Sequence, residues 1–369
     1  MILSGQYFLQ SLKLYIISFI CNDMKYPVCN IIPPDMLKEL LAEVEEEEKN
    51  KVLRTLMIDT RMREHRSILG SMPAIFPLAA EKDICIYDAQ NTRNVRTSTR
   101  VRCVGDPKSN DKAVNEAYDG FDATYDLYKT VYGRKSIDDN NFALKGYVHW
   151  GQDYVNAFWD GTKMCFGDGN PRIGIDGFTS AIDVMAHELT HGVTQYEAAL
   201  EYWCDRDHHP GAINESISDV FGSLVKQYVS KQTADKADWL IGHGLFTDTN
   251  IALRSMKAPG TARPNDPQPA HIRDYRNLPT DEDNDNGGVH INSGIPNKAF
   301  YTTAVEIGGY AWEKAGLIWY KTLGSGLHTD CSFQEFADHT FVEAGNLFGV
   351  GKSEQDAVRK GWQEVGIKV

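Results

Sequence analysis

The sequence predicts an α+β protein of two domains, and a change of apolar pattern along the chain carries that prediction. Up to about residue 175, short apolar runs alternate with turn residues, as in GYVHWGQDYVNAFWDGTKMCFGDG, where Asp160-Gly161 supplies a turn. Beyond residue 180, apolar residues recur at helical spacing, interrupted by a long loop rich in Pro, Asp and Asn. With 369 residues, 42% of them hydrophobic, the chain can build more than one core. We expect a β-rich domain at 76–200 and an α-helical domain at 201–369.

The chain ahead of these domains divides into two further segments. Residues 1–23 contain the apolar run LKLYIISFIC, which is too short to span a bilayer and lacks a typical signal-peptide cleavage site. They form an apolar extension or a signal-like segment, which leaves the compartment open and favours secretion over the cytoplasm. Residues 35–66 carry apolar residues at helical spacing around an acidic block, predicting one or two helices. The two prolines of GSMPAIFPLAA favour a boundary near residues 70–80.

The composition excludes some classes of partner and site. A net charge of −13 argues against a nucleic-acid partner, because such affinity needs clustered Lys and Arg. The seven cysteines contain no C-x-x-C pair, so the sequence predicts neither a thiolate zinc ribbon nor a disulfide framework. Within the first domain, AVNEAYDGFDATYDLYKTVYG predicts one helix.

The stretch IDVMAHELTHGVTQY predicts a helix with two histidines on one face. It has no proline, and its apolar residues recur at helical intervals. His187 and His191 are four residues apart and can present two imidazoles to one tetrahedral ion, while Glu188 can take a proton from a water on that ion. Two surface histidines on an ordinary helix would give the same pattern, so a third ligand is needed.

The third ligand decides which kind of zinc site this can be. Thr194 and Glu197 exclude the class that extends the motif to H-E-x-x-H-x-x-G-x-x-H. Downstream, GAINESISDVFGSLVKQYVSK predicts a second helix with Asn214 and Glu215 in its first turn. Glu215 is the best third ligand. Asp219, four residues on, could accept a hydrogen bond from the distal ring nitrogen of a ligand histidine.

With these motifs the sequence resembles the thermolysin-like family of zinc metalloendopeptidases. The similar stretches are HELTH, GAINESISD, NAFWDG, FGDG, LRSM, DNGGVHINSG and the C-terminal pattern around Phe341 to Ile367; they lie between about residue 80 and residue 369 and follow the family's order along the chain. The resemblance implies a strand-rich N-terminal domain and a helical C-terminal domain with the active-site cleft between them. It implies one catalytic Zn²⁺ bound by His187, His191 and Glu215, with Glu188 as general base in the hydrolysis of internal peptide bonds.

The same resemblance implies roles for residues around the zinc. His290 and Tyr202 would donate hydrogen bonds to the oxyanion that forms on the attacked carbonyl, and Asp285 would orient His290. Asp219 and Asn214 would support the ligand histidines.

The resemblance also implies how a substrate is held. Asn156, the backbone of Ala157 and Arg254 would hold the substrate main chain in an extended conformation. The pocket after the scissile bond would be lined by Val184, Ile241 and Leu253. Cleavage on the amino side of bulky hydrophobic residues would follow, although ordinary core packing equally accounts for those three side chains.

The N-terminal stretch YPVCNIIPPDMLKELL resembles the short propeptide of the protealysin-like subgroup through its Pro-Pro-x-x-Leu core. Residues 24–75 would then be an inhibitory propeptide, and the protein would be made as a zymogen. Pro33-Pro34 fixes an extended backbone that can dock without further ordering. Cys29 leaves open a latch in which its thiolate binds the zinc.

The chain departs from the family at two places. Members with a paired calcium site carry acids where this chain has Lys226, Leu240 and His243, and Asp183 and Asp238 alone remain. A lysine ammonium removes the charge compensation that two close divalent ions need, which argues against the paired site and leaves calcium elsewhere open.

The second departure is the segment EYWCDRDHHPG, which is about four residues longer than the family pattern. Its Cys204, His208 and His209 could compete for zinc, but loop histidines are usually solvated.

Two alternatives remain at this point. A zinc aminopeptidase shares H-E-x-x-H and a downstream glutamate, but its G-x-M-E-N-like motif is absent. A zinc-stabilised binding protein of weak activity would predict loss of Glu188 or His290, and both are present. We therefore expect peptide or protein substrates, the chain's own propeptide as inhibitor, no stable membrane span and a monomer.

Overall fold

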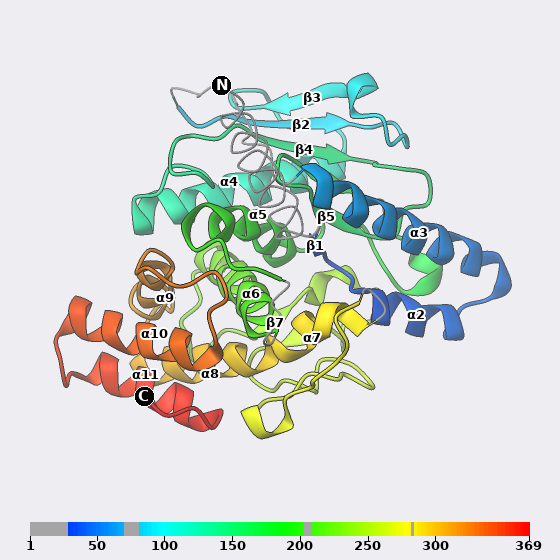
Figure 1. The fold of residues 1–369 in the computed structure, drawn as a ribbon. Coiled ribbons are helices and arrows are strands. Elements are labelled where there is room, and N and C mark those ends of the chain that lie inside the picture. The colour runs from blue at the N-terminus through cyan, green and yellow to red at the C-terminus, as the bar shows by residue number, and fades with distance from the viewer. Residues whose placement is uncertain (1–28, 70–80, 203–207, 282–283) are drawn as a thin grey trace, which may run out of the picture.

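The structure is a computed structural model that describes residues 29–69, 81–202, 208–281 and 284–369. The apolar segment 1–23 and the predicted boundary at 70–80 lie outside the described residues. Within them, a strand-rich half precedes a helical half, and the elements α5 and α6 run through the middle of the molecule (Figure 1). The predicted α+β class with a helical C-terminal domain is confirmed.

A six-stranded mixed sheet dominates the first half, in the order β1-β5-β6-β4-β2-β3. Its strands are β1 (Cys29–Asn30), β2 (Ile84–Asp88), β3 (Thr99–Cys103), β4 (Leu144–Val148), β5 (Ala157–Trp159) and β6 (Met164–Phe166). Strands β5 and β6 form the predicted hairpin, and Asp160 in its turn accepts hydrogen bonds from the backbone of Thr162 and Lys163. Strand β1 comes from the N-terminal segment and pairs antiparallel with β5 at the edge of the sheet.

A disulfide joins Cys85 of β2 to Cys103 of β3, so the prediction of no disulfide framework was wrong. The two residues are direct cross-strand partners, with Cα atoms 4.1 Å apart. Their pairing follows from strand register, which the spacing of the cysteines along the sequence does not reveal. Of the other described cysteines, Cys165 is a free thiol in the core, and Cys331 is also buried.

Three helices connect the sheet to the second half. Helix α4 (Lys112–Tyr132) packs on the sheet; Asp111 caps its N-terminus, and Gly133 ends it in a left-handed conformation. Helix α5 (Ile182–Glu197) is buried on every side from residue 183 to 194, because α4 covers one side and α6 (His209–Ser230) the other. The helices predicted around the H-E-x-x-H motif and around Glu215 are thus present, and they pack against each other.

The remaining helices build the C-terminal half. After the small sheet of β7 (Leu240–Ile241) and β8 (Arg254–Ser255) come α7 (Asp285–Asn292), α8 (Gly294–Ile307), α9 (Ala315–Leu323), α10 (Phe333–Phe348) and α11 (Ser353–Glu364). Short 3₁₀ turns lie at Val95–Thr97, Pro171–Ile173, His243–Leu245 and Ile272–Asp274. Trp319 and Trp362, both fully buried, stack in the core between α9 and α11. Among the described residues, no helix has both the length and the apolar character that a membrane span needs.

The N-terminal segment forms two helices, which lie beside the strand-rich half and the helical half of the molecule (Figure 1, blue). They are α2 (Pro34–Glu43) and α3 (Glu46–Leu69), which confirms the prediction of one or two helices there. Pro34 occupies the first helical position of α2, where its missing N–H costs no hydrogen bond.

His149, just after β4, holds two loops of the strand-rich half together. Its Nδ1 lies 2.6 Å from Asp168 Oδ1 and its Nε2 2.8 Å from Asp111 Oδ2. The hydrogen bond with Asp168 raises the pKa of His149, burial opposes it, and Asp111 adds to the rise, giving about 9 against an ordinary 6.5. Because the folded pKa exceeds the unfolded one, this stabilisation is complete below about pH 6.5 and is lost as the pH rises through about 9.

We therefore expect the free energy of unfolding to fall more steeply between pH 7 and pH 10 in the parent protein than in His149→Gln. Denaturant unfolding of both in a Glu188→Gln background, which prevents self-digestion, measures the two slopes. Parallel slopes would show that the two aspartates do not hold a charged imidazole.

Candidate active site

The centre of the site is a set of donors from α5 and α6. His187 and His191 lie on one face of α5 with their Nε2 atoms 3.0 Å apart. From α6, Glu215 places Oε2 3.4 Å from His187 Nε2 and Oε1 3.8 Å from His191 Nε2. All three side chains are buried, so these atoms converge in a space from which the protein excludes most solvent. Glu215 lies in the second turn of α6 rather than the predicted first, because His209 and Pro210 begin the helix.

A second layer of polar groups fixes the two imidazoles. The Nδ1 of His187 lies 2.9 Å from Asp219 Oδ1, and the Nδ1 of His191 lies 2.9 Å from Asn214 Oδ1. Since these oxygens accept the Nδ1 protons, both Nε2 lone pairs are directed at the shared space. The structure therefore brings together Asp219 and Asn214 with the histidines as the sequence suggested.

Arg254 and Asn297 complete this layer through contacts that were not predicted from the sequence. Arg254 donates two hydrogen bonds to Asp219, each 2.7 Å long, and Asn297 donates a third at 2.8 Å. The buried guanidinium of Arg254 thus binds the carboxylate that orients His187, and the predicted role of Arg254 in holding the substrate main chain stays a prediction. Asn297 belongs to NSGIPNKA, directly after the His290 motif, and this position could have been a clue.

Unpaired buried atoms test whether these residues fit a zinc ion. Glu215 Oε2, Glu188 Oε1 and His290 Nε2 are buried and have no hydrogen-bond partner among the described residues. Such atoms are costly unless a ligand satisfies them. Ligand atoms of His187, Glu188 and His191 also lie within 4.8 Å of one another. Two imidazoles and a carboxylate are a donor set that Zn²⁺ takes, so the residues fit the ion.

The two glutamates compete for the place of third ligand, and their contacts separate them. Glu188 Oε2 accepts a hydrogen bond from the backbone N–H of Trp159 at 3.0 Å, which draws this carboxylate toward strand β5. Burial raises the pKa of Glu188 to about 8, whereas the positive charges of the nearby histidines overcome burial and hold the pKa of Glu215 well below its usual range. The geometry and the charge favour Glu215 as the metal ligand and leave Glu188 able to take up a proton.

His290 faces the same space from the other side. Its Nε2 lies 3.3 Å from Glu215 Oε2, and its Nδ1 lies 2.5 Å from Asp285 Oδ1. Burial lowers the pKa of His290, but the charges of Glu215 and Asp285 outweigh burial and raise it to about 9. The turn that places Asp285 is left-handed at four successive residues, 285–288, which is why Asn and Gly occur there.

Tyr202 lies on the opposite side of Glu215 from His290. Its hydroxyl donates to Glu215 Oε1 at 2.6 Å and lies 3.3 Å from His191 Nδ1. The structure thus places Tyr202 at the site, with its hydroxyl directed at the carboxylate of Glu215.

The groups predicted to hold a substrate main chain hold the N-terminal segment instead. The side chain of Asn156 accepts from Ile32 N–H at 3.0 Å and donates to Ile32 C=O at 3.0 Å. The carbonyl of Ala157 accepts from Ile31 N–H at 3.1 Å. An extended peptide therefore pairs with strand β5 along its whole length, including Trp159, whose backbone N–H contacts Glu188.

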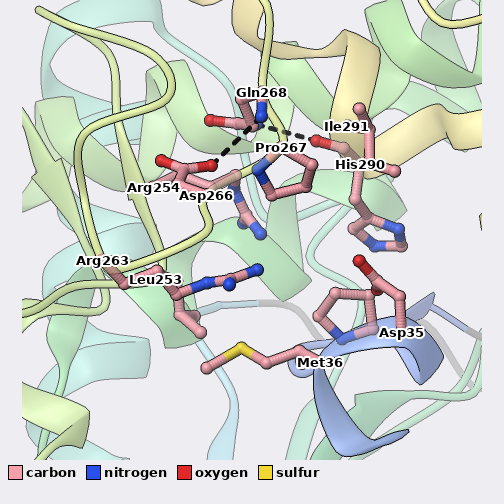
Figure 2. A pocket seen from close by; sticks show the side chains of 11 residues that line it. Asp35, Met36, Leu253, Arg254, Arg263, Asp266, Pro267, Gln268, His290 and Ile291 are labelled. Carbon is pink, nitrogen blue, oxygen red and sulfur yellow. Dashed lines mark hydrogen bonds between the residues drawn. The ribbon is translucent and has the colours of Figure 1, made fainter. Parts of the chain in front are cut away.

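The three apolar residues predicted to line a pocket do not behave alike. All three are buried in the main core, and of the three only Leu253 also lines the recess beneath His290 that Figure 2 shows.

Lys226 occupies the region of the doubted calcium site. Its ammonium lies 3.3 Å from Asp183 Oδ2 and 2.9 Å from Asp238 Oδ2, and it donates to the carbonyl of Leu240 at 3.0 Å. Asp183 and Asp238, the two acids that remain there, thus both form ion pairs with Lys226.

The histidines of the inserted segment are packed, so the expectation that they are solvated was wrong. His208 is 7% exposed, with Nε2 3.0 Å from Thr280 Oγ1. The ring of His209 stacks on Phe333 at 4.2 Å. Helix α6 begins at His209, and this local order was not apparent from the composition of the segment. Cys204 lies outside the described residues.

A sheet edge that holds an extended peptide above a buried H-E-x-x-H helix is the arrangement of a zinc metallopeptidase, and comparisons with known proteins agree. Two family models match: the thermolysin metallopeptidase catalytic domain over residues 72–195 and the thermolysin metallopeptidase alpha-helical domain over residues 198–367. The chain belongs to the thermolysin family of zinc metallopeptidases.

Individual relatives narrow the comparison. An extracellular metalloprotease of Pectobacterium carotovorum subsp. carotovorum is 44% identical over 352 residues, covering 93% of this chain and 97% of that protein. A thermolysin of Alicyclobacillus acidocaldarius subsp. acidocaldarius is 37% identical over 268 residues, covering 70% of this chain and 46% of that protein.

Among solved structures, the precursor of protealysin, a metalloproteinase from Serratia proteamaculans, aligns with a TM-score of 0.81 at 43% identity. The alignment covers 92% of this chain and 99% of that one, which is more than residues 76–369 alone would give, so it includes part of the N-terminal segment. The predicted resemblance to the protealysin-like subgroup is confirmed.

Proposed function

We propose that this zinc metalloendopeptidase is made as a zymogen with residues 24–75 as its propeptide, that Ile31 and Ile32 of the propeptide block the substrate cleft, and that the mature enzyme cleaves before bulky hydrophobic residues. The proposal rests on one observation. Asn156 and Ala157 form hydrogen bonds with the main chain of Ile31 and Ile32. An inhibitor that uses the hydrogen bonds of a substrate main chain must leave before a substrate can enter.

Further contacts support the inhibitory role of the segment. Asp59 of α3, which is 1% exposed, accepts from Tyr154 Oη at 2.6 Å and from Asn156 Nδ2 at 2.9 Å. Thr55 Oγ1 accepts from the backbone N–H of Val155 at 3.0 Å. The segment thus also fixes the orientation of Asn156 while it fills the cleft. The side chain of Cys29 is outside what the structure describes, so a thiolate latch stays an untested alternative.

The extended chain in the cleft favours an endopeptidase over an aminopeptidase. Ile31 and Ile32 are held in the middle of a polypeptide, with Asn30 before them and Pro33 after them. A cleft that accepts an internal segment in this way has no need to recognise a free amino terminus.

In the proposed mechanism, His187, His191 and Glu215 would hold the zinc, which would supply Lewis-acid polarisation and make the attacking water more acidic. Glu188 takes the proton of the attacking water at Oε1 and passes it to the leaving amine, while the backbone of Trp159 holds its Oε2. His290, oriented by Asp285, and Tyr202 donate hydrogen bonds to the oxyanion. Asp219 and Asn214 keep the histidines in place, and Arg254 acts through Asp219.

The remaining parts of the proposal concern organisation and location. We infer the domain division at residues 76–200 and 201–369, a monomer, and secretion, because the Pectobacterium relative is named extracellular. Leu253 in the recess beneath His290 supports an apolar pocket after the scissile bond, with Val184 and Ile241 behind it as core.

Hydrolysis of internally quenched peptides by the matured enzyme tests the specificity. Peptides that differ only in the residue after the scissile bond should be cleaved about 10- to 100-fold faster with Leu than with Gly, since burying a leucine contributes about 1.5–3 kcal/mol. Mass spectrometry of the products should place the cut on the amino side of Leu, and should follow Leu when it is moved along the peptide. Activity should disappear with a zinc chelator and return with zinc. Equal rates for Leu and Gly would refute the apolar pocket.

A further inference from the structure

The recess beneath His290 contains a charged group that the proposed mechanism does not use. Its walls include Asp35 and Met36 from α2, and Leu253, Arg254, Arg263 and His290 from the catalytic part of the chain. Figure 2 shows the side chain of Arg263 extending into the recess between Arg254 and Met36.

Arg263 and Arg254 form ion pairs with acids from different parts of the chain. Arg254 is fully engaged by Asp219, a residue of the catalytic part that stays in place. Arg263 donates to Glu39 of α2 at 3.0 Å, and its side chain is only 9% exposed. Its Nε is buried and has no hydrogen-bond partner among the described residues.

Asp266 also borders the recess, but its carboxylate binds the backbone and forms no ion pair with Arg263. Its two carboxylate oxygens accept hydrogen bonds from the backbone of Ala262 and Gln268, and so hold the loop that carries Arg263. When α2 leaves with the N-terminal segment, Arg263 therefore loses the carboxylate with which it forms its ion pair.

We propose that in the mature enzyme Arg263 binds a carboxylate of the substrate on the carboxyl side of the scissile bond. This inference rests on the proposed function, in which Leu253 lines the pocket that follows that bond. In the precursor, Glu39 of the N-terminal segment then takes the place that an acidic group of the substrate takes in the mature enzyme. The group is a Glu or Asp side chain or the terminal carboxylate of a short peptide, because a guanidinium pairs with either in the same geometry.

Matched substrates measure this preference in the matured enzyme. Quenched peptides with amidated ends carry Leu after the scissile bond and either Glu or Gln at the two positions beyond it. For the parent enzyme we expect kcat/KM to be about 10-fold higher with Glu, since about 1.4 kcal/mol of added transition-state binding is a factor of ten. Short peptides with free or amidated carboxyl ends distinguish the terminal carboxylate from the side chain.

Variants assign the preference to Arg263. In Arg263→Gln the Glu-to-Gln ratio should fall to about one or below, and Arg263→Lys should restore part of it. Arg172→Gln is the matched control, because Arg172 also contacts acids of the N-terminal segment, Glu47 and Glu48, but lies 69% exposed outside the recess. Its ratio should equal that of the parent.

The outcomes separate the inference from the proposed function. A ratio near one for the parent, or one that Arg263→Gln leaves unchanged, overturns the inference while cleavage before Leu still stands. Failure of the matured parent to cleave any of the peptides overturns both. Circular dichroism of Arg263→Gln, together with its cleavage of the Gln peptide, shows whether the variant is folded, and Arg263→Lys tests the charge if it is not.

Discussion

Replacing Glu188 by Gln is expected to lower kcat/KM of the matured enzyme by about 10²- to 10⁴-fold, the contribution that general acid–base catalysis typically makes. The amide keeps the shape of the side chain and can still contact the backbone of Trp159, but it cannot take a proton at the unpaired Oε1. Self-processing should stop for the same reason, so the variant should accumulate as the full-length chain. Peptide hydrolysis and gel mobility measure the two effects.

The metal content of the variant separates loss of the base from loss of the ion. Glu188→Gln should retain one zinc per chain, whereas Glu215→Gln should lose zinc as well as activity, because Glu215 lies 3.4 Å from His187 Nε2. Glu313→Gln, at an exposed glutamate before α9, serves as the control and should match the parent. A Glu188→Gln enzyme that keeps full activity and one zinc per chain would refute the assigned mechanism.

Replacing Asp59 by Ala is expected to lower the free energy that holds the N-terminal segment in place by about 3–5 kcal/mol, since the side chain that accepts hydrogen bonds from two buried donors is lost. Those donors are Tyr154 Oη and Asn156 Nδ2, and the latter belongs to the side chain that holds Ile32. Hydrogen exchange across α3, measured in the Glu188→Gln background so that the chain stays intact, should become roughly 10²- to 5 × 10³-fold faster, since each 1.36 kcal/mol is a factor of ten.

Two variants sharpen that experiment. Asp59→Asn keeps one acceptor and should show an intermediate rate. Glu46→Gln, at an 87% exposed residue of the same helix, should leave exchange unchanged. In the active enzyme, Asp59→Ala should shorten the delay before a fresh precursor cleaves a quenched peptide. Identical exchange in Asp59→Ala and its parent would mean that α3 does not fasten the segment.

The parts of the molecule that sequence reasoning predicted depend on local pattern. Helices α4, α5 and α6 follow from apolar spacing, and the spacing of His187 and His191 is itself a helical repeat. The long-range contacts did not follow in the same way. The disulfide of Cys85 and Cys103 depends on strand register.

The contacts of buried polar side chains were the feature that the sequence predicted least well. Arg254 reaches Asp219 across 35 residues and Asn297 reaches the same carboxylate across 78. No periodicity links such positions, because their distance is set by how α6, β8 and α8 pack. The family resemblance named Arg254 as a substrate group, but only the folded structure shows that its guanidinium is engaged inside the protein.

The double use of Asn156 limits how the enzyme can escape its own inhibition during evolution. Under the proposed function, Oδ1 and Nδ2 of Asn156 form hydrogen bonds with Ile32 in the precursor and later with the substrate main chain. A substitution at Asn156 that frees the cleft would also cripple turnover, so selection for unregulated proteolysis could not act through this position. Heritable loss of latency should instead accumulate in the N-terminal segment, whose residues are discarded and carry no catalytic duty.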